Sequence, residues 1–145
     1  MKLEKHITID NADSTAVAVL QEATGLSKQL IKQAMTKGAV WLTRKNATQR
    51  IRRADKSLSS GDSLHIYYDE AVLQQQPCPA ELIADEGSYS IWYKPYGVLC
   101  QGSKWGDHCT VVRWSERHLQ PERPAFTVHR LHRAASGPIL VAHSK

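Results

Sequence analysis

The sequence predicts an α+β protein built from two small modules. Residues 14–24 and 28–37 carry apolar side chains at helical spacing, whereas residues 63–68 and 89–94 alternate as half-buried strands do. Between these halves lies a glutamine run followed by two prolines, at residues 74–79, and this composition is typical of an extended connector. The length of 145 residues allows one ordinary domain or two very small ones.

The first module is expected to begin with a short strand at residues 7–9 and a helix that ends near Thr24. Asp13 or Ser14 can cap this helix, and Gly25 supplies the left-handed residue that stops it. Apolar residues at i, i+3, i+4 and i+7 give the helix one buried face. These residues are Ala16, Val19, Leu20 and Ala23.

Ser27 is the predicted N-cap of a second helix, which Gly38 ends, and Leu26 is placed to pack on Ile31 as a hydrophobic staple. One arc of this helix is apolar and the other is polar, which gives one face for a core and one for solvent or a ligand. The polar arc holds Lys28, Gln29, Lys32, Gln33, Thr36 and Lys37.

Strands are predicted at residues 39–43 and 63–68, and the second is entered through a turn at Gly61 and Asp62. The residues between them, 44–60, are expected to form a polar and basic connection. Two short helices followed by a strand pair make a compact α+β unit.

Basic residues are concentrated in this module, where positions 28 to 56 hold nine Lys or Arg residues and one acid, Asp55. A folded module would gather them into a positive patch suited to the phosphates of structured RNA. Solvated basic faces also occur on proteins that bind no nucleic acid. The nine residues are Lys28, Lys32, Lys37, Arg44, Lys45, Arg50, Arg52, Arg53 and Lys56.

Composition excludes several classes of protein. The formal net charge of +5 favours a polyanionic partner, and no stretch of apolar residues is long enough to span a membrane. The N-terminus lacks the apolar core of a signal peptide, so we expect a cytoplasmic protein. The three cysteines, Cys78, Cys100 and Cys109, include no CxxC pair, which argues against a disulfide framework.

The order of the first-module motifs resembles the S4 RNA-binding domain over residues 5–69. The pattern Gly-Leu-Ser-Lys-x-x-Ile-Lys-x-x-Met-x-x-Gly-Ala-Val spans residues 25–40, and Ser-Gly-Asp-Ser-Leu spans residues 60–64. This resemblance implies a small αα-β module that binds structured RNA such as ribosomal or transfer RNA.

The second module carries two short motifs. Its predicted elements are a strand at 89–94, a turn at 95–97, a loop at 102–106, a helix from Asp107 to about residue 119, and strands at 125–128 and 139–142. The first strand ends in Lys94-Pro95-x-Gly97, and the strand at 125–128 leads into a nine-residue segment. That segment reads His129-Arg130-Leu131-His132-Arg133-Ala134-Ala135-Ser136-Gly137.

Together these motifs resemble the RluA-type RNA pseudouridine synthases, in which His-Arg-Leu-Asp is followed by Thr-Ser-Gly or a close variant. The resemblance implies an isomerase that converts uridine to pseudouridine in RNA without a cofactor. His132 stands at the position of the family's catalytic Asp, and Arg130 matches the Arg that helps to hold the base out of the helix. Arg133 can clamp a phosphate or displace a base, or it forms a surface ion pair. Lys94, Pro95, Gly97, His129, Leu131, Ser136 and Gly137 are the remaining motif residues.

Several features depart from that family. Besides His132, Ala135 replaces the Thr and Pro138 replaces an aliphatic residue. In the family the sheet is mixed and is completed by further strands, so we expect an incomplete N-terminal part of the catalytic domain, poorly stable by itself. Because imidazole lacks the carboxylate that the reaction needs, we expect the chain to be inactive as it stands.

Two functions therefore remain open. The chain is either a defective pseudouridine synthase or a non-catalytic RNA-binding protein whose S4-like module is the working part. The expected organisation is an RNA-binding domain at 1–69, a linker at 70–87 and a truncated synthase domain at 88–145. A zinc site formed by His129 and His132 with Cys109 and His118 fits no compact motif, so no metal is predicted.

Overall fold

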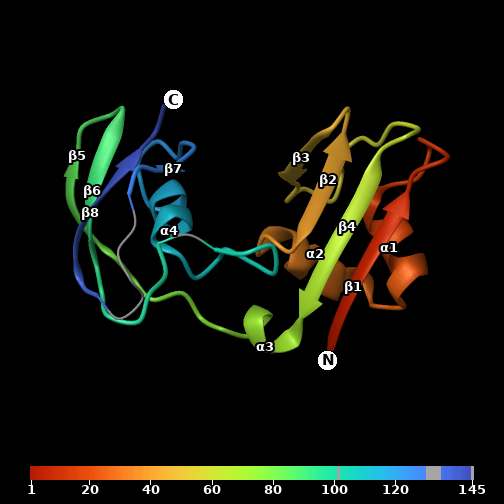
Figure 1. Cartoon of the computed structure of the whole chain (residues 1–145), viewed down its shortest axis with the longest axis horizontal. Helices are drawn as coiled ribbons and strands as arrows, with labels where there is room; N and C mark the ends of the chain where they lie inside the picture. Colours follow the sequence, from red (N-terminus) through yellow and green to blue (C-terminus); the bar gives the residue numbers. More distant parts are fainter. Residues whose placement is uncertain (101, 130–134, 145) are drawn as a thin grey trace. The chain divides into compact units, whose positions relative to one another are not determined.

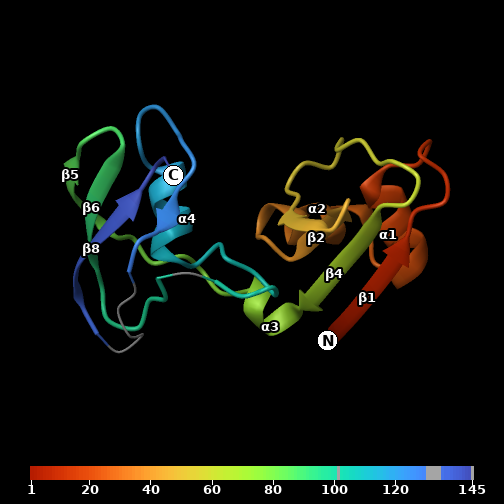
Figure 2. The ribbon, with the colours of Figure 1, turned by 45° about the horizontal axis from the view of Figure 1, so that its top comes forward.

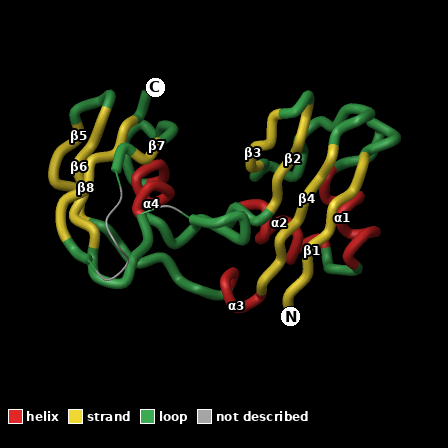
Figure 3. The backbone as a smooth tube through the Cα atoms, viewed as in Figure 1, coloured by secondary structure: helices red, strands yellow, loops and turns green. Residues whose placement is uncertain are grey.

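The computed structural model describes residues 1–100, 102–129 and 135–144. The chain divides into two compact units, the first comprising Met1–Gln74 with Lys104–Gly106 and the second comprising Gln75–Ser103 with Asp107–Lys145. Each unit combines a four-stranded sheet with helix, as Figure 3 shows by colour, and the predicted α+β class is confirmed. Among the helices described, none is long and apolar enough to span a bilayer.

The sheet of the first unit contains four antiparallel strands in the order β1-β4-β2-β3 (Figure 1). The strands are β1 (Lys2–Thr8), β2 (Val40–Arg44), β3 (Ala47–Arg50) and β4 (Ser63–Asp69). Leu64, Ile66 and Tyr68 of β4 are buried, whereas the residues between them are half-buried. This period of two confirms the predicted alternation and gives the sheet a core face and an outer face.

The first helix, α1 (Ala16–Thr24), begins one residue later than a cap at Ser14 would place it and two later than a cap at Asp13. Thr15, rather than Asp13 or Ser14, is the N-cap, and its hydroxyl accepts a hydrogen bond from the backbone N–H three residues on. At the other end, Gly25 has a φ of 76°, in the left-handed region that favours glycine. The predicted glycine stop is confirmed.

The second helix, α2 (Lys28–Thr36), starts at the predicted N-cap. The Ser27 hydroxyl accepts a hydrogen bond from the backbone N–H of Leu30 at 3.2 Å. Leu26 and Ile31 are both buried in one cluster, as expected for a hydrophobic staple. The polar arc of α2 therefore faces away from the core.

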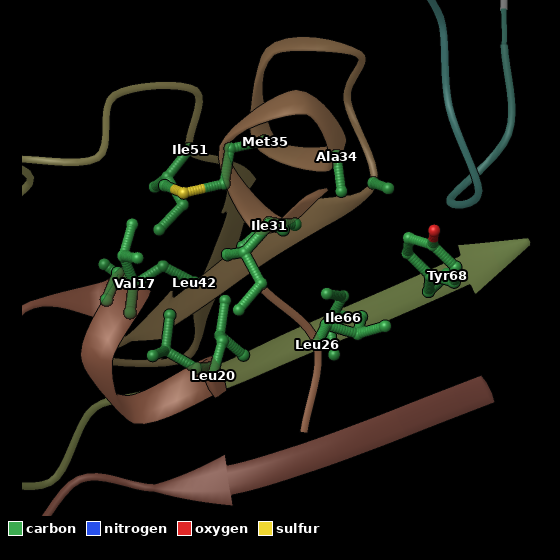
Figure 4. Close-up of a cluster of buried hydrophobic side chains, with 14 of the residues drawn as sticks. Val17, Leu20, Leu26, Ile31, Ala34, Met35, Leu42, Ile51, Ile66 and Tyr68 are labelled. Carbon is green, nitrogen blue, oxygen red and sulfur yellow. The ribbon is translucent and has the colours of Figure 1, made fainter. Parts of the chain in front are cut away.

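The core of the first unit lies between the two helices and the inner face of the sheet (Figure 4). It is made of aliphatic side chains with one methionine and one tyrosine, so the outer face of α2 and the outer face of the sheet remain for other roles. Its central members are Val17, Leu20, Leu26, Ile31, Ala34, Met35, Leu42, Ile51, Ile66 and Tyr68.

The segment expected to be only a polar connection, residues 44–60, contains β3. A two-residue turn at Lys45 and Asn46, with φ values of 51° and 65°, joins β2 to β3 in a tight hairpin. Positive φ at both central residues is the geometry of a type I′ turn, which matches the twist of paired strands. The sequence lacks the glycine that usually marks such a turn.

The second unit holds an antiparallel sheet in the order β5-β6-β8-β7, with helix α4 packed against β6. Figure 2 shows β5, β6 and β8 of this sheet together with α4. Its elements are β5 (Glu81–Asp85), β6 (Tyr89–Lys94), α4 (Val111–Arg117), β7 (Phe126–Thr127) and β8 (Gly137–Ala142). Residues 70–87 were expected to be a linker that neither packs nor pairs, but they contain α3 (Glu70–Leu73) and β5, which pairs with β6. The N-cap of α4 is Thr110, not Asp107, because the Thr110 hydroxyl accepts the backbone N–H of Arg113.

A smaller core holds the second unit together, with Trp92, Val111, Leu119, Ile139 and Val141 buried. The Trp92 indole N–H donates to the Ser90 hydroxyl at 2.8 Å, and that oxygen lies 2.7 Å from the His143 ring. Ser90 is fully buried, so this serine and histidine form an internal structural network and not an accessible nucleophile.

Candidate active-site segment and nucleic-acid interface

The two motifs of the second unit lie together at one end of its sheet. Lys94, the last residue of β6, pairs with Gly137, the first residue of β8, and Tyr93 pairs with Pro138. The Pro-x-Gly turn leaves β6 at this end, and Gly97 there has a φ of 85°. The motifs, more than thirty residues apart in sequence, are thus neighbours in the fold.

The side chain of Lys94 is fully buried although it carries an ammonium group. Its Nζ donates hydrogen bonds to the backbone carbonyls of Pro95 and Ala135. Burying a charged group is unfavourable unless it is hydrogen-bonded, and these two carbonyls help to offset that cost. Lys94 therefore joins the first motif to the second.

The second motif is also anchored at its start. The exposed ring of His129 accepts a hydrogen bond at Nε2 from the backbone N–H of Leu140 in β8, at 3.0 Å. His129 thus fixes one end of the motif segment, as Lys94 fixes the other at Ala135.

Four of the sequence-predicted site residues lie outside the described residues. They are Arg130, Leu131, His132 and Arg133. The described neighbours on the two sides are His129 and Ala135, and Ser136 beyond them is exposed.

Residues 88–145 match the family model of RNA pseudouridylate synthases. A comparison with curated proteins found no match to the chain. The match supports a pseudouridine synthase, whose family acts on RNA, and we call residues 88–145 the synthase segment. It contains both motifs described above, whereas the basic cluster lies in the first unit and outside the match.

On the first unit, the lysines of α2 line a groove of about 570 Å³. Lys28 and Lys32 are exposed, while Lys37 is half-buried and its Nζ donates to the carbonyl of Leu73 at 2.7 Å. Two lysines one helical turn apart thus present their ammonium groups on one face. The lining residues are Lys28, Gln29, Lys32, Gln33, Thr36 and Lys37.

Arg44 forms an ion pair with an acidic residue of the same unit. Its Nη2 donates to the carboxylate of Asp62 at 2.8 Å, and the carboxylate also accepts the backbone N–H of Ser59 at 2.8 Å. The Arg44 hydrogen bond holds the pKa of Asp62 below its usual value, and Asp62 in turn raises the pKa of Arg44. Because Asp62 is only 3% exposed, this pair closes the long loop before β4.

Two further arginines are tied to the exit of α2. The Nε of Arg50 donates to the Gly38 carbonyl at 2.8 Å, and Nη1 of Arg52 donates to the Thr36 carbonyl at 3.3 Å. These are among the last carbonyls of the helix and its exit, which have no partner within the helix. Arg50 and Arg52 thus stabilise the end of α2, besides any contact with a ligand.

The remaining basic residues of the cluster face solvent to different degrees. Lys45 is exposed at the tip of the β2–β3 hairpin, and Lys56 is half-buried. Arg53 is exposed and lies 3.6 Å from Asp55, with side chains that are 84% and 77% exposed. An ion pair this open contributes little to stability and leaves the guanidinium accessible to a phosphate.

Sequence reasoning missed a polar network on the outer face of the first sheet. Nδ1 of His6 and Nδ1 of His65 are 2.7 Å apart, Nε2 of His6 is 2.7 Å from the Glu4 carboxylate, and Nε2 of His65 is 2.7 Å from the Thr43 hydroxyl. The hydrogen bond from His6 lowers the pKa of Glu4. Burial, with the charge of His6, lowers the pKa of His65. The alternation in β4 signalled that His65 would face outward, but its partners come from other strands.

The lowered pKa of His65 favours its neutral ring, whose Nε2 lies beside the Thr43 hydroxyl. The Thr43 hydroxyl in turn lies 2.7 Å from that of Thr48 on β3, and the network crosses all four strands.

Proposed function

We propose that the chain is a protein of the RluA-type pseudouridine synthases that binds structured RNA through an S4-like first unit and does not isomerise uridine as it stands. The match of the synthase segment carries this proposal, because it includes the segment in which His132 replaces the family's Asp. The resemblance of residues 5–69 to the S4 domain supports the RNA-binding part.

The absence of turnover follows from the chemistry at position 132. The isomerisation breaks the bond between ribose C1′ and uracil N1 and forms one between C1′ and C5. In the family an Asp carboxylate acts as the nucleophile or base, and with a pKa of about 3.9 it is ionised at neutral pH. Imidazole is mostly neutral near pH 7 and has no oxygen to take that place.

The frame around this position keeps several of the family's other motif residues, although Ala135 and Pro138 depart from them. Lys94 and His129 hold the two ends of the segment, and Gly97 and Gly137 adopt positive φ values where the motifs have glycine. A frame that holds its shape without the reacting carboxylate fits a protein that still engages RNA. Arg130 and Arg133 would then contact phosphate or base.

The binding half of the proposal rests on the exposed lysines. Lys28 and Lys32 point from one face of α2, and Lys45 and Arg53 add charge from the hairpin and the following loop. Contacts of this kind neutralise phosphates with little reading of sequence, so affinity for ribosomal or transfer RNA should fall steeply with salt.

The decisive experiment incubates the full chain with uridine-labelled ribosomal RNA and measures both complex formation and pseudouridine. We expect salt-dependent binding without pseudouridine. Turnover would contradict the assignment of His132 as disabling, and a chain that fails to bind structured RNA at low salt would overturn the binding half.

A further inference from the structure

The outer face of the first sheet carries aromatic rings next to its polar network. Trp41 on β2 and His65 on β4 are cross-strand partners, and Tyr67 follows His65 on the same face. Trp105, from the Lys104–Gly106 segment of the same unit, makes an edge contact with Tyr67 at 5.6 Å between ring centres. Trp41, Tyr67 and Trp105 are each half-buried, so part of every ring reaches solvent.

Each of these rings has a cation from the same unit over its face. The guanidinium of Arg50 lies 4.3 Å from the Trp41 ring centre, Lys104 Nζ lies 4.7 Å from that of Tyr67, and Lys2 Nζ lies 4.7 Å from that of Trp105. Cation–π contacts at exposed sites contribute only about 0.5–1 kcal/mol. A ligand that offers both a flat ring and a negative charge can therefore replace the lysines over the rings.

From this pattern we infer that the outer sheet face, formed by Trp41, Tyr67 and Trp105 with Lys2, Arg50 and Lys104, binds a single-stranded RNA segment. Its bases stack on the aromatic rings and on the planar guanidinium of Arg50. Its phosphates pair with Lys2 and Lys104. The inference rests on the proposed RNA-binding function and adds to it a second surface, separate from the lysines of α2.

The chemistry favours unpaired RNA over other polyanions. Every nucleotide brings one ring and one phosphate, which matches a surface where rings and cations alternate. Stacking on aromatic side chains requires bases that are not already stacked in a duplex. An acidic peptide would meet the cations but would leave the rings unused. Glu4 on this face accepts a hydrogen bond from His6, which offsets part of its repulsion of phosphate.

The two RNA surfaces differ in composition and therefore in ligand. The groove on α2 is lined by lysine, glutamine and threonine and by no aromatic residue among those that line it. It suits the backbone of folded RNA, whereas the outer sheet face suits exposed bases. A charge reversal on α2 and an aromatic replacement on the sheet should accordingly affect different RNAs.

The test compares a labelled ten-nucleotide oligouridylate with an abasic oligomer of the same length, using the full chain. Trp41→Leu with Tyr67→Leu keeps apolar bulk but removes two stacking rings. We expect oligouridylate affinity to fall at least tenfold, since stacking is worth about 1–3 kcal/mol per base. Trp41→Phe with Tyr67→Phe should stay within about threefold of the parent, and the abasic oligomer should bind the parent protein as weakly as oligouridylate binds the leucine variant.

The inference is overturned if the folded leucine variant binds oligouridylate as the parent does, or if the abasic oligomer or a polyglutamate peptide binds as tightly as oligouridylate. Should the leucine variant not fold, the abasic comparison and quenching of tryptophan fluorescence by oligouridylate decide the question on the parent protein. Lys28→Glu with Lys32→Glu separates the proposals: it should weaken structured RNA and spare oligouridylate. Loss of structured-RNA binding alone is compatible with the proposed sheet surface. Loss of oligouridylate binding alone is compatible with the proposed α2 surface.

Discussion

The imidazole of His65 resists protonation because burial disfavours its charged form and, secondarily, because of the charge of His6, whose Nδ1 lies 2.7 Å from that of His65. Its pKa is lowered from 6.5, so between 6.5 and that lower value the unfolded chain binds a proton that the folded chain does not. Stability must then rise with pH across this window, and fall as the pH drops below 6.5. The low pKa of Glu4 acts at more acidic pH, as the carboxylate protonates.

We therefore expect the free energy of unfolding to decrease from pH 7 to pH 5.5, by no more than about 1.4 kcal/mol per pH unit for one proton. His65→Gln keeps a hydrogen-bonding side chain but removes the titration, so the slope should flatten. His118→Gln, which alters an exposed histidine stacked on Trp114, is the control and should leave it unchanged. Urea unfolding across this range measures the slope, and an equal slope in all three proteins would refute the assignment.

Lys94 is buried, so its hydrogen bonds to backbone carbonyls should matter for stability. Lys94→Met removes the donor from the carbonyls of Pro95 and Ala135, and each carbonyl left unpaired costs about 1–3 kcal/mol. We expect a loss of that order in the stability of the second unit and faster hydrogen exchange in β8. Lys5→Met, at an exposed lysine of the first unit, is the matched control. Unchanged exchange in β8 would show that Lys94 does not hold the motif segment.

At the scale of an element, α2 gives the clearest prediction for binding. Lys28→Glu with Lys32→Glu should reduce the slope of log affinity against log salt for structured RNA by about 1 for each lysine. Lys5→Glu with Arg117→Glu changes the net charge equally at other exposed positions and serves as control. A slope that falls as much in the control would mean that net charge, and not this face, governs binding.

The β2–β3 hairpin offers a test of backbone conformation. Asn46 has a φ of 65°, which costs most residues about 1–2 kcal/mol. Asn46→Gly should raise stability by up to about 1 kcal/mol, and Asn46→Val should lower it by about 1–2 kcal/mol. Asn11→Gly and Asn11→Val, at an exposed loop residue outside any helix or strand, provide the comparison. Thermal unfolding measures the change in stability of each variant. Identical changes at positions 46 and 11 would exclude a left-handed turn at Asn46.

Elements with strong local signals were predictable from sequence. The N-cap at Ser27, the stop at Gly25 and the strand at β6 depend on neighbours within a few residues, and each is found where it was expected. β3 and β5 were missed although each pairs with a strand next to it in the chain, because the local signals around them are weak. β3 follows a turn without glycine, and β5 follows a Gln- and Pro-rich stretch.

At the scale of the whole molecule, the candidate site could likewise be predicted only in part from the sequence. The two motifs could be recognised in the sequence, but the link from Lys94 to Ala135 could not, because it joins residues 41 apart in sequence. The basic cluster was visible as composition, yet only the fold separates the solvent-facing Lys28 and Lys32 from Arg44, which Asp62 holds. Side-chain partners across strands are set by packing, which periodicity does not encode.

The bonds from Arg50 and Arg52 to the exit of α2 bear on how a polyanion meets the first unit. A helix has a macrodipole that is positive at its start, where Lys28 stands, and negative at its end, where phosphate would be repelled. Two guanidinium groups on the Gly38 and Thr36 carbonyls offset that negative end. An RNA backbone that followed α2 would then meet less repulsion at the end of the helix.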